Sequence, residues 1–154
     1  EFVEASKIIG QKNKKINFLI AGDGAESNLL RREIAKAENV SFLGYVSDMV
    51  DFYNKIDCLV VPSHWEPMGL VHLESQAAGV PVVASNVPGL NEVLNDKIDA
   101  LLFEPKNVKD LVNQIGLIIS DRRIRSSLIK NGQKNAKKYS LKNYIKKLND
   151  IYEK

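Results

Sequence analysis

One stretch decides the fold: "CLVVPSHWEPMGLVHLESQAAGVPVVAS", residues 58–85. It opens and closes with short apolar runs, at residues 58–63 and 80–85. Continuous runs of this kind predict strands that are covered on both faces, as in parallel sheets. The segment between the runs predicts a helix from Met68 to Gly79. The stretch is therefore one strand–helix–strand unit, the connection that parallel strands require.

The same alternation continues on both sides of this unit. Further apolar runs predict strands at 16–21, 40–44 and 100–105. Helical patterns fall at 26–38, 47–56 and 108–121, a short turn is expected around 89–96, and two more helices follow. Ser47, Asn107 and Ser140 are the expected N-caps of three of these helices. The predicted fold is a doubly wound α/β domain with a parallel sheet and Rossmann-like topology.

Length and composition agree with one globular domain. The chain has 154 residues, with 44% hydrophobic and 27% charged, and no apolar run is long enough for a membrane span. No signal-peptide pattern opens the sequence. The single cysteine, Cys58, lies in an apolar run and is expected to be a buried thiol. It fits a reducing compartment, so we expect a cytoplasmic location.

Charge is distributed unevenly along the chain. Residues 1–103 carry 9 basic and 14 acidic side chains, whereas residues 104–154 carry 13 and 5. The basic tail is either the solvated face of helices or a peripheral contact with acidic lipids at the inner face of the membrane. It shows no nucleic-acid binding motif, so a nucleic-acid partner is not expected.

In a doubly wound sheet, ligands bind at the carboxyl ends of the strands. The loop after the first predicted strand contains Gly22 and Gly24 but lacks the third glycine of a dinucleotide fingerprint. These two glycines indicate either a ligand-binding loop or only a tight turn. No nicotinamide or flavin cofactor is therefore predicted.

Glu74 poses the main question about the helix in residues 58–85. On a helix turning about 100° per residue, His72, Ser75 and Gln76 occupy one face, which is predicted to be exposed. Glu74 falls within the opposite arc, which is predicted to face the core. Because Glu is seldom buried without a partner, it is either a paired structural carboxylate or a group that faces a ligand. The apolar members of its arc are Leu70, Val71, Leu73, Ala77 and Ala78.

The loop before this helix favours the second interpretation. Pro67 keeps Glu66 extended, and Gly69 leaves the first helical turn uncovered. Backbone amides from Met68 to Val71 can then bind an anion, as helix N-termini do. A diphosphate bound there would have Glu66 at one end and Glu74 at the other, each able to accept hydroxyl groups. Two sugars joined through a diphosphate have this shape.

At these residues the sequence resembles the retaining glycosyltransferases of family GT4, the group 1 glycosyl transferases. The similarity is to the C-terminal, donor-binding half of their GT-B fold and covers nearly the whole chain. Its specific part is the pair Glu66 and Glu74, with Pro-Met-Gly-Leu-Val in the interval. The weaker matches follow in the family's order: "INFLIAGDG", "VSFLGYV", "PGLNEV" and "LLFEP". The resemblance implies transfer of a hexosyl unit from a UDP- or GDP-linked sugar to a glycan, lipid-linked or small-molecule acceptor.

The resemblance also implies roles for single residues. Glu66, the catalytic candidate, would hold hydroxyls of the donor sugar, and Glu74 would bind the ribose diol. The implied route is front-face attack, in which the departing phosphate takes the acceptor proton, so Glu66 is not assigned as a covalent nucleophile. Further donor-binding positions are Gly69, Leu70 and Val71 for the diphosphate, Val46 for the base, Met68 where the family often has Phe, Gly89 near the sugar or acceptor, and Gly22 and Gly24.

Part of the family's site is expected outside this sequence. The family has a diphosphate-clamping Arg and Lys, a first strand and an N-terminal acceptor domain ahead of the matched region. The chain also opens in a helical pattern without an initiator Met. Residues 1–154 are therefore expected to be the donor-binding domain of a longer protein, inactive by itself.

Neither a metal nor a cofactor beyond the donor is predicted. His64 and His72 do not pair with Cys, Asp or Glu at metal-ligand spacing, and His72 is expected to be solvated. Two alternative functions remain. A nucleotide-sugar epimerase would release epimerised nucleotide-sugar without an acceptor, and a non-catalytic nucleotide-binding module would consume no nucleotide-sugar.

Overall fold

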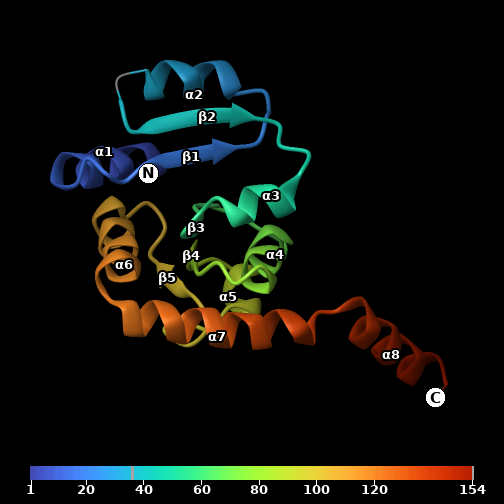
Figure 1. The fold of residues 1–154 in the computed structure, drawn as a ribbon. Helices are drawn as coiled ribbons and strands as arrows, with labels where there is room; N and C mark the ends of the chain where they lie inside the picture. The colour runs from blue at the N-terminus through green and yellow to red at the C-terminus, as the bar shows by residue number, and fades with distance from the viewer. Residues whose placement is uncertain (36, 154) are drawn as a thin grey trace.

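A computed structural model describes residues 1–35 and 37–153, and this part of the chain holds five strands and eight helices (Figure 1). The strands are β1 (Phe18–Ala21), β2 (Val40–Gly44), β3 (Leu59–Val61), β4 (Val82–Ser85) and β5 (Leu101–Phe103). The helices are α1 (Phe2–Lys12), α2 (Ser27–Ile34), α3 (Met49–Asn54), α4 (Val71–Ala77), α5 (Leu90–Val93), α6 (Val108–Ser120), α7 (Arg122–Lys138) and α8 (Leu141–Tyr152).

Every predicted strand is present, and most helices lie inside the predicted ranges. The helix expected at 26–38 is α2, which ends at Ile34; Lys36 of that range lies outside the described residues. Asn107 and Ser140 cap α6 and α8 as predicted. The cap of α3 is Asp48 rather than Ser47, because the Asp48 carboxylate accepts a hydrogen bond from the Asp51 amide at 2.9 Å.

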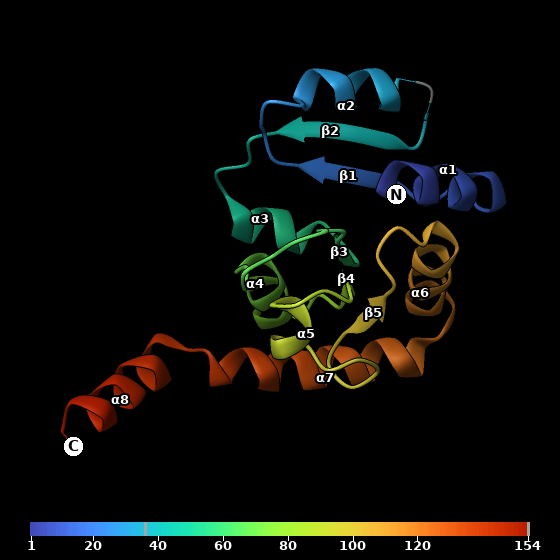
Figure 2. The same cartoon turned by 180° about the vertical axis from the view of Figure 1, so that it is seen from behind.

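The strands form two parallel ladders rather than the one continuous sheet that was expected. β1 pairs with β2, and β4 lies between β3 and β5. Figure 2 shows the two ladders from behind, with β1 and β3 as the inner strands. No described strand pairs with both inner strands, and a groove separates them.

Helices cover both faces of the central strand β4, as a doubly wound fold requires. Val83 packs into a large cluster with residues of α1, α6 and α7. Its neighbours Val82 and Ala84 point the other way, into a cluster with α5 and the loop before β5. All four β4 residues are buried, which explains why the sequence reads as an unbroken apolar run. The α/β fold and the parallel pairing are confirmed.

The orientation predicted for α4 is wrong. His72, Ser75 and Gln76, expected outside, are at most 1% exposed. Leu73 is buried as expected, but Glu74 and the other residues of its arc, Leu70, Val71, Ala77 and Ala78, are exposed. The helix therefore turns its polar side inward.

Contacts with α7 explain this orientation. Gln76 donates to the Asp99 carbonyl at 3.0 Å and accepts from Asn135 of α7 at 3.1 Å. Asn135 also reaches the Val93 carbonyl at 3.0 Å. Gly132 lets the helices approach closely, since a Cβ there would lie 3.0 Å from Gln76 Cγ. Buried amides with partners cost little, so this network permits a polar interface.

The helix also begins and ends differently from the prediction. Gly69 has φ +71°, a left-handed conformation that cannot continue a helix, so α4 starts at Val71 instead of Met68. At the other end Gly79 has φ +79°, and the Gly79 and Val80 amides donate to the Gln76 and Ser75 carbonyls. This is the Schellman arrangement that glycine commonly provides.

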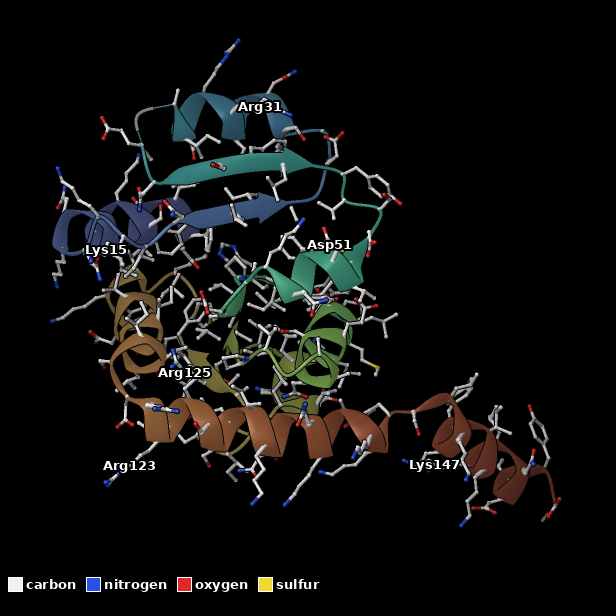
Figure 3. All side chains as sticks on the ribbon, viewed as in Figure 1. Lys15, Arg31, Asp51, Arg123, Arg125 and Lys147 are labelled. Carbon is white, nitrogen blue, oxygen red and sulfur yellow. The ribbon has the colours of Figure 1, made fainter. Side chains whose placement is uncertain are left out.

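The last helix extends away from the rest of the chain in both ribbon views. Ser140 caps it, and none of its described residues is buried. Figure 3 places Lys147 on this projecting helix, whereas Arg123 and Arg125 lie on α7 beside the folded body. Its exposed apolar side chains are Leu141, Tyr144, Ile145, Ile151 and Tyr152.

Candidate functional site

The loop after β3 connects directly to α4 and carries Glu66. The side chain of Glu66 is half-buried, and its Oε2 lies 3.5 Å from the Ser63 hydroxyl. Glu66 folds back over Gly69, because a Cβ on that glycine would lie 3.1 Å from the carboxyl carbon of Glu66. Gly69 thus has two functions in this loop: it takes a left-handed conformation, and it makes room for the carboxylate.

The loop after β4 supports the Glu66 segment from the other side. Gly89 is buried with φ +88°, and a Cβ there would lie 1.9 Å from the Glu66 carbonyl and 2.7 Å from the Pro67 carbonyl. No side chain fits between these backbones. Gly89 therefore fixes the position of Glu66 by direct backbone packing, which is a closer relation than the sequence suggested.

The amides at the start of α4 are free of helical bonding. The first backbone hydrogen bond of this segment runs from the Glu74 amide to the Leu70 carbonyl at 2.9 Å. Leu70 is the N-cap and offers no side-chain acceptor to the amides that follow it. Since the first amides of a helix have no partner within it, the Gly69–Val71 backbone can bind an added acceptor.

Glu74 stands on the exposed face of α4 but is not without a partner. The Tyr53 hydroxyl of α3 lies 3.0 Å from Glu74 Oε2 and 3.1 Å from the Val71 carbonyl. Burial raises the pKa of Tyr53, and the Glu74 carboxylate raises it further, so this phenol remains a donor at neutral pH. Because the Tyr53 hydroxyl can donate only one hydrogen bond, the Glu74 carboxylate can accept further hydrogen bonds from a ligand. Sequence patterns gave no signal for Tyr53, because only the fold brings α3 to α4.

His72 lies behind the loop rather than in solvent, contrary to prediction. It is fully buried, and neither ring nitrogen has a hydrogen-bond partner among the described residues. Burial lowers its pKa, while the nearby charge of Glu66 acts in the opposite direction. His72 therefore sits as a neutral imidazole at neutral pH, next to the segment that carries Glu66.

The remaining predicted residues form the rim around this centre. Val46 packs against the cluster of Phe52, Tyr53 and Val80, which connects the loop after β2 to α3. Met68 is 37% exposed and Leu70 is 63% exposed. The structure thus brings together Val46, Glu66, Gly69, Val71, Glu74 and Gly89 through α3 and the loops after β3 and β4.

Gly22 and Gly24 lie in a separate hollow of the same rim. They line it with Asp23, Ser27 and Phe42, and the Gly22 amide donates to the Gly44 carbonyl at 2.8 Å. The Ser27 hydroxyl and Gly24 amide lower the pKa of Asp23 by hydrogen bonding to its carboxylate. Figure 3 shows Arg31 on α2, where its guanidinium lies 4.2 Å from the Phe42 ring centroid. No described contact joins this hollow to Glu66.

The groove between β1 and β3 opens next to the site. Its lining includes Tyr53, His64 and Val71, and His64 Nε2 lies 2.9 Å from Glu1 Oε1. Cys58 also lines it, and burial raises the pKa of this thiol to about 12, so it is no nucleophile at neutral pH. Among the described residues no group of three His, Cys, Asp or Glu side chains could hold a metal ion.

The sequence is similar to those of known glycosyltransferases. Residues 1–135 match the family described as Glycosyl transferases group 1. An uncharacterized glycosyltransferase of Methanocaldococcus jannaschii is 33% identical over 96% of this chain and 39% of its own length. An N,N'-diacetylbacillosaminyl-diphospho-undecaprenol alpha-1,3-N-acetylgalactosaminyltransferase of Campylobacter jejuni is 31% identical over 90% of this chain and 36% of its own.

Solved structures show the same fold. The C-terminal domain of a group 1 glycosyl transferase from Francisella tularensis superposes with a TM-score of 0.81 at 23% identity, over 91% of this chain and 78% of that one. The Anabaena protein HepE in complex with UDP-glucose has a TM-score of 0.78 at 25% identity, over 87% of this chain and 38% of that one. The chain spans about two fifths of the length of the curated relatives it matches.

Proposed function

Because this chain belongs to the group 1 glycosyl transferases, we propose that it is the nucleotide-sugar binding domain of a retaining hexosyltransferase. One observation carries the proposal: two carboxylates, Glu66 and Glu74, flank uncapped backbone amides in a loop that other elements hold in place. Gly89 packs against the backbone of Glu66, and Tyr53 bonds to Glu74. Anionic acceptors on both sides of an anion-binding backbone suit a diphosphate with a sugar at each end.

The nucleotide end of the donor is assigned to Glu74. Its carboxylate is exposed, is oriented by Tyr53, and keeps acceptor capacity for the two ribose hydroxyls. The amides of Gly69, Leu70 and Val71 bind the diphosphate. Main-chain groups around Val46, which packs against the cluster that contains Tyr53, hold the base of a UDP- or GDP-linked donor.

The sugar end of the donor is assigned to Glu66. Its half-buried carboxylate orients the hexosyl hydroxyls, while Gly89 packs against the backbone of the same residue and Met68 follows in the same loop. As the bond to the diphosphate breaks, negative charge builds up on the departing phosphate, and preorganised amides stabilise such charge. The phosphate takes the acceptor proton, so Glu66 positions the sugar and is not a covalent nucleophile.

We place this domain within a longer enzyme. An N-terminal domain would bind the glycan, lipid-linked or small-molecule acceptor, and cations that precede this segment would complete the diphosphate site. Residues 1–154 alone would then bind nucleotide weakly, with a dissociation constant of roughly 0.1–1 mM, since each lost contact of about 1.4 kcal/mol is a tenfold loss of affinity. They would transfer no sugar.

The proposed location is the cytoplasm, with peripheral contact at the inner face of the membrane. No helix in residues 1–35 or 37–153 is long and apolar enough to cross a bilayer. The projecting α8 presents exposed apolar side chains beside Lys142, Lys146 and Lys147, the composition of a helix that lies on an acidic lipid surface.

A titration of the full-length protein with UDP, GDP and their hexose conjugates tests the donor assignment. A ligand at a hundred times its dissociation constant should stabilise the protein by about 2.7 kcal/mol, which a thermal shift detects. Glu66→Gln should sharply slow sugar transfer and weaken binding of the nucleotide-sugar. Its effect on the affinity for the free nucleotide should be small. Equal loss for both ligands would mean that the sugar lies elsewhere, and no response to any nucleotide would overturn the proposal.

A further inference from the structure

Tyr53 connects two parts of the candidate site that lie far apart in the sequence. It belongs to α3, the helix that follows the loop around Val46, and α3 lies beside α4 in both ribbon views (Figures 1 and 2). The Tyr53 hydroxyl lies 3.0 Å from Glu74 Oε2 and 3.1 Å from the Val71 carbonyl, both on α4. One side chain of α3 therefore holds the carboxylate of α4 that is assigned to the ribose.

Packing fixes the ring of Tyr53. The residue is 4% exposed, and its ring centroid lies 5.9 Å from that of Phe52 at an interplanar angle of 64°. Both rings belong to the cluster with Val80, against which Val46 packs. Burial raises the pKa of the phenol and Glu74 raises it further, so the hydroxyl keeps its proton at neutral pH. A ligand on the surface of α4 meets the Glu74 carboxylate, and Tyr53 acts on that ligand through Glu74.

The Glu74 carboxylate depends on this hydroxyl for its orientation. Glu74 is exposed, it forms no ion pair within residues 1–35 and 37–153, and the terminal torsion of a glutamate has a broad energy minimum. The Tyr53 hydroxyl can donate only one hydrogen bond, and a bond to the charged carboxylate is stronger than one to the Val71 carbonyl. The Tyr53 hydroxyl therefore fixes the plane of the carboxylate.

A carboxylate with a fixed plane distinguishes a diol from a single hydroxyl group. Two neighbouring hydroxyls can bond to both oxygens of a carboxylate at once only when its plane faces them. A single hydroxyl bonds equally well to either oxygen of a carboxylate that rotates freely. Fixing the plane before the ligand arrives reduces the entropy lost on binding, and the ligand that makes two bonds gains more from this than the ligand that makes one.

We propose that Tyr53 is a positioning residue that makes the donor site selective for ribonucleotides over 2′-deoxyribonucleotides. The inference rests on the proposed function, which assigns the ribose diol to Glu74. A ribonucleotide offers two neighbouring hydroxyls to the carboxylate that Tyr53 holds, whereas a 2′-deoxyribonucleotide offers only one. Because the Tyr53 hydroxyl bonds to groups of α4, this selectivity should be the same for uridine and guanosine nucleotides.

Calorimetric titration of the full-length polypeptide with UDP, 2′-deoxy-UDP, GDP and 2′-deoxy-GDP tests the inference. Wild type should prefer the ribonucleotide about 10- to 100-fold, the effect of losing one hydrogen bond to a charged group. Tyr53→Phe should reduce this preference about 2- to 10-fold, because the ligand itself must then order the Glu74 side chain. The loss should fall on the ribonucleotide, with the affinity for the 2′-deoxy form nearly unchanged. Glu74→Ala should abolish the preference.

Tyr139→Phe is the matched control. Tyr139 stands at the end of α7 and is 40% exposed, so this substitution removes a tyrosine hydroxyl away from the candidate site. It should leave the affinities for all four nucleotides unchanged. Because phenylalanine keeps the ring that packs against Phe52, Tyr53→Phe should fold like wild type, which thermal unfolding of both variants verifies.

Three results would overturn the inference. If Tyr53→Phe weakened the ribonucleotide and its 2′-deoxy form equally, Tyr53 would have only a structural role, and the proposed function would stand. If the preference for the ribonucleotide survived Glu74→Ala, the ribose would lie elsewhere, and its assignment to Glu74 would fall as well. If wild type bound none of the four nucleotides, the proposed function itself would be wrong.

Discussion

The buried face of α4 is largely polar and its exposed face is largely apolar, the reverse of an ordinary amphipathic helix. The inner face carries His72, Ser75 and Gln76, whereas the outer face carries Val71, Glu74, Ala77 and Ala78. On the inner face, Ser75 donates to the Val80 carbonyl at 3.1 Å and Gln76 bonds to α7. On the outer face, the Glu74 side chain has a single hydrogen-bond partner among the described residues, a tyrosine that the fold brings from α3.

The two faces of α4 therefore have different functions. The inner hydrogen bonds fix where α4 stands on the β3–β5 ladder, and therefore where its first turn lies. The outer face keeps groups available that a purely structural helix would bury. We infer that substitutions on the inner face should reduce stability, while those on the outer face should reduce ligand binding.

The largest effect should come from Gly89, the glycine that supports the loop leading into α4. Gly89→Ala places a Cβ 1.9 Å from the Glu66 carbonyl in a left-handed backbone conformation. Steric strain of this kind adds to overpacking, so we expect a loss of about 3 kcal/mol in the free energy of unfolding. Donor affinity should fall with it, because the Glu66 loop must move. Urea unfolding and nucleotide titration measure the two effects.

A second glycine serves as the matched control. Gly116 lies inside α6, and a Cβ there meets nothing within 4 Å. Gly116→Ala should raise stability by up to about 1 kcal/mol, the helix-propensity difference. If Gly89→Ala proves as harmless as this control, the close packing of Gly89 on Glu66 is not what positions the loop.

The inner face is tested by removing its partner on α7. Asn135→Ala leaves the buried Gln76 side-chain oxygen and Val93 carbonyl without their donor. We expect unfolding to become easier by about 2–3 kcal/mol, since buried acceptors lose their partner. Asn131, half-buried one turn earlier, donates to the Ile98 carbonyl at 2.9 Å in a solvent-exposed hydrogen bond, so Asn131→Ala should cost only about 0.5–1.5 kcal/mol. Equal costs would contradict the special role of the buried network.

The outer face is tested at Glu74. Glu74→Ala should weaken nucleotide binding roughly 10- to 100-fold, because hydrogen bonds to a charged group contribute about 1.5–3 kcal/mol. Stability should hardly change, since the side chain is exposed. Tyr53→Phe, which removes only the orienting hydroxyl, should have a smaller effect on binding. Calorimetry on the full-length protein measures affinity. Reduced stability with unchanged affinity would return Glu74 to a structural role.

The smallest effect concerns the pH dependence of the inner face. Burial lowers the pKa of His72 below its ordinary value of 6.5, so the unfolded chain binds this proton more readily. Stability from this group is therefore complete above about pH 6.5 and decreases as the pH falls, by at most about 2 kcal/mol at pH 5. His72→Leu should flatten the profile between pH 7 and 5, because it removes the buried imidazole. If the stability of wild type and His72→Leu depended on pH in the same way, His72 would not be the source of this pH dependence.

The sequence alone determined the order of the elements and the family. Runs such as residues 80–85 are apolar throughout because both faces of β4 are covered, and a strand with this property is visible without any coordinates. Asn107 and Ser140 were identifiable as caps because their hydrogen bonds reach only three residues along the chain. The pair Glu66 and Glu74 could likewise be identified from the sequence, because its spacing is a short-range feature of the chain.

Only the tertiary structure decided which way α4 faces and what surrounds its glutamates. The apolar arc of Leu70, Val71 and Ala77 predicted a buried side, but Gln76 found its partners in Asp99 and Asn135, 23 and 59 residues away. A polar side chain is exposed or buried according to whether distant groups satisfy it, and periodicity contains no information about those groups. Tyr53 beside Glu74, Gly89 against Glu66 and the groove between β1 and β3 all depend on such distant contacts.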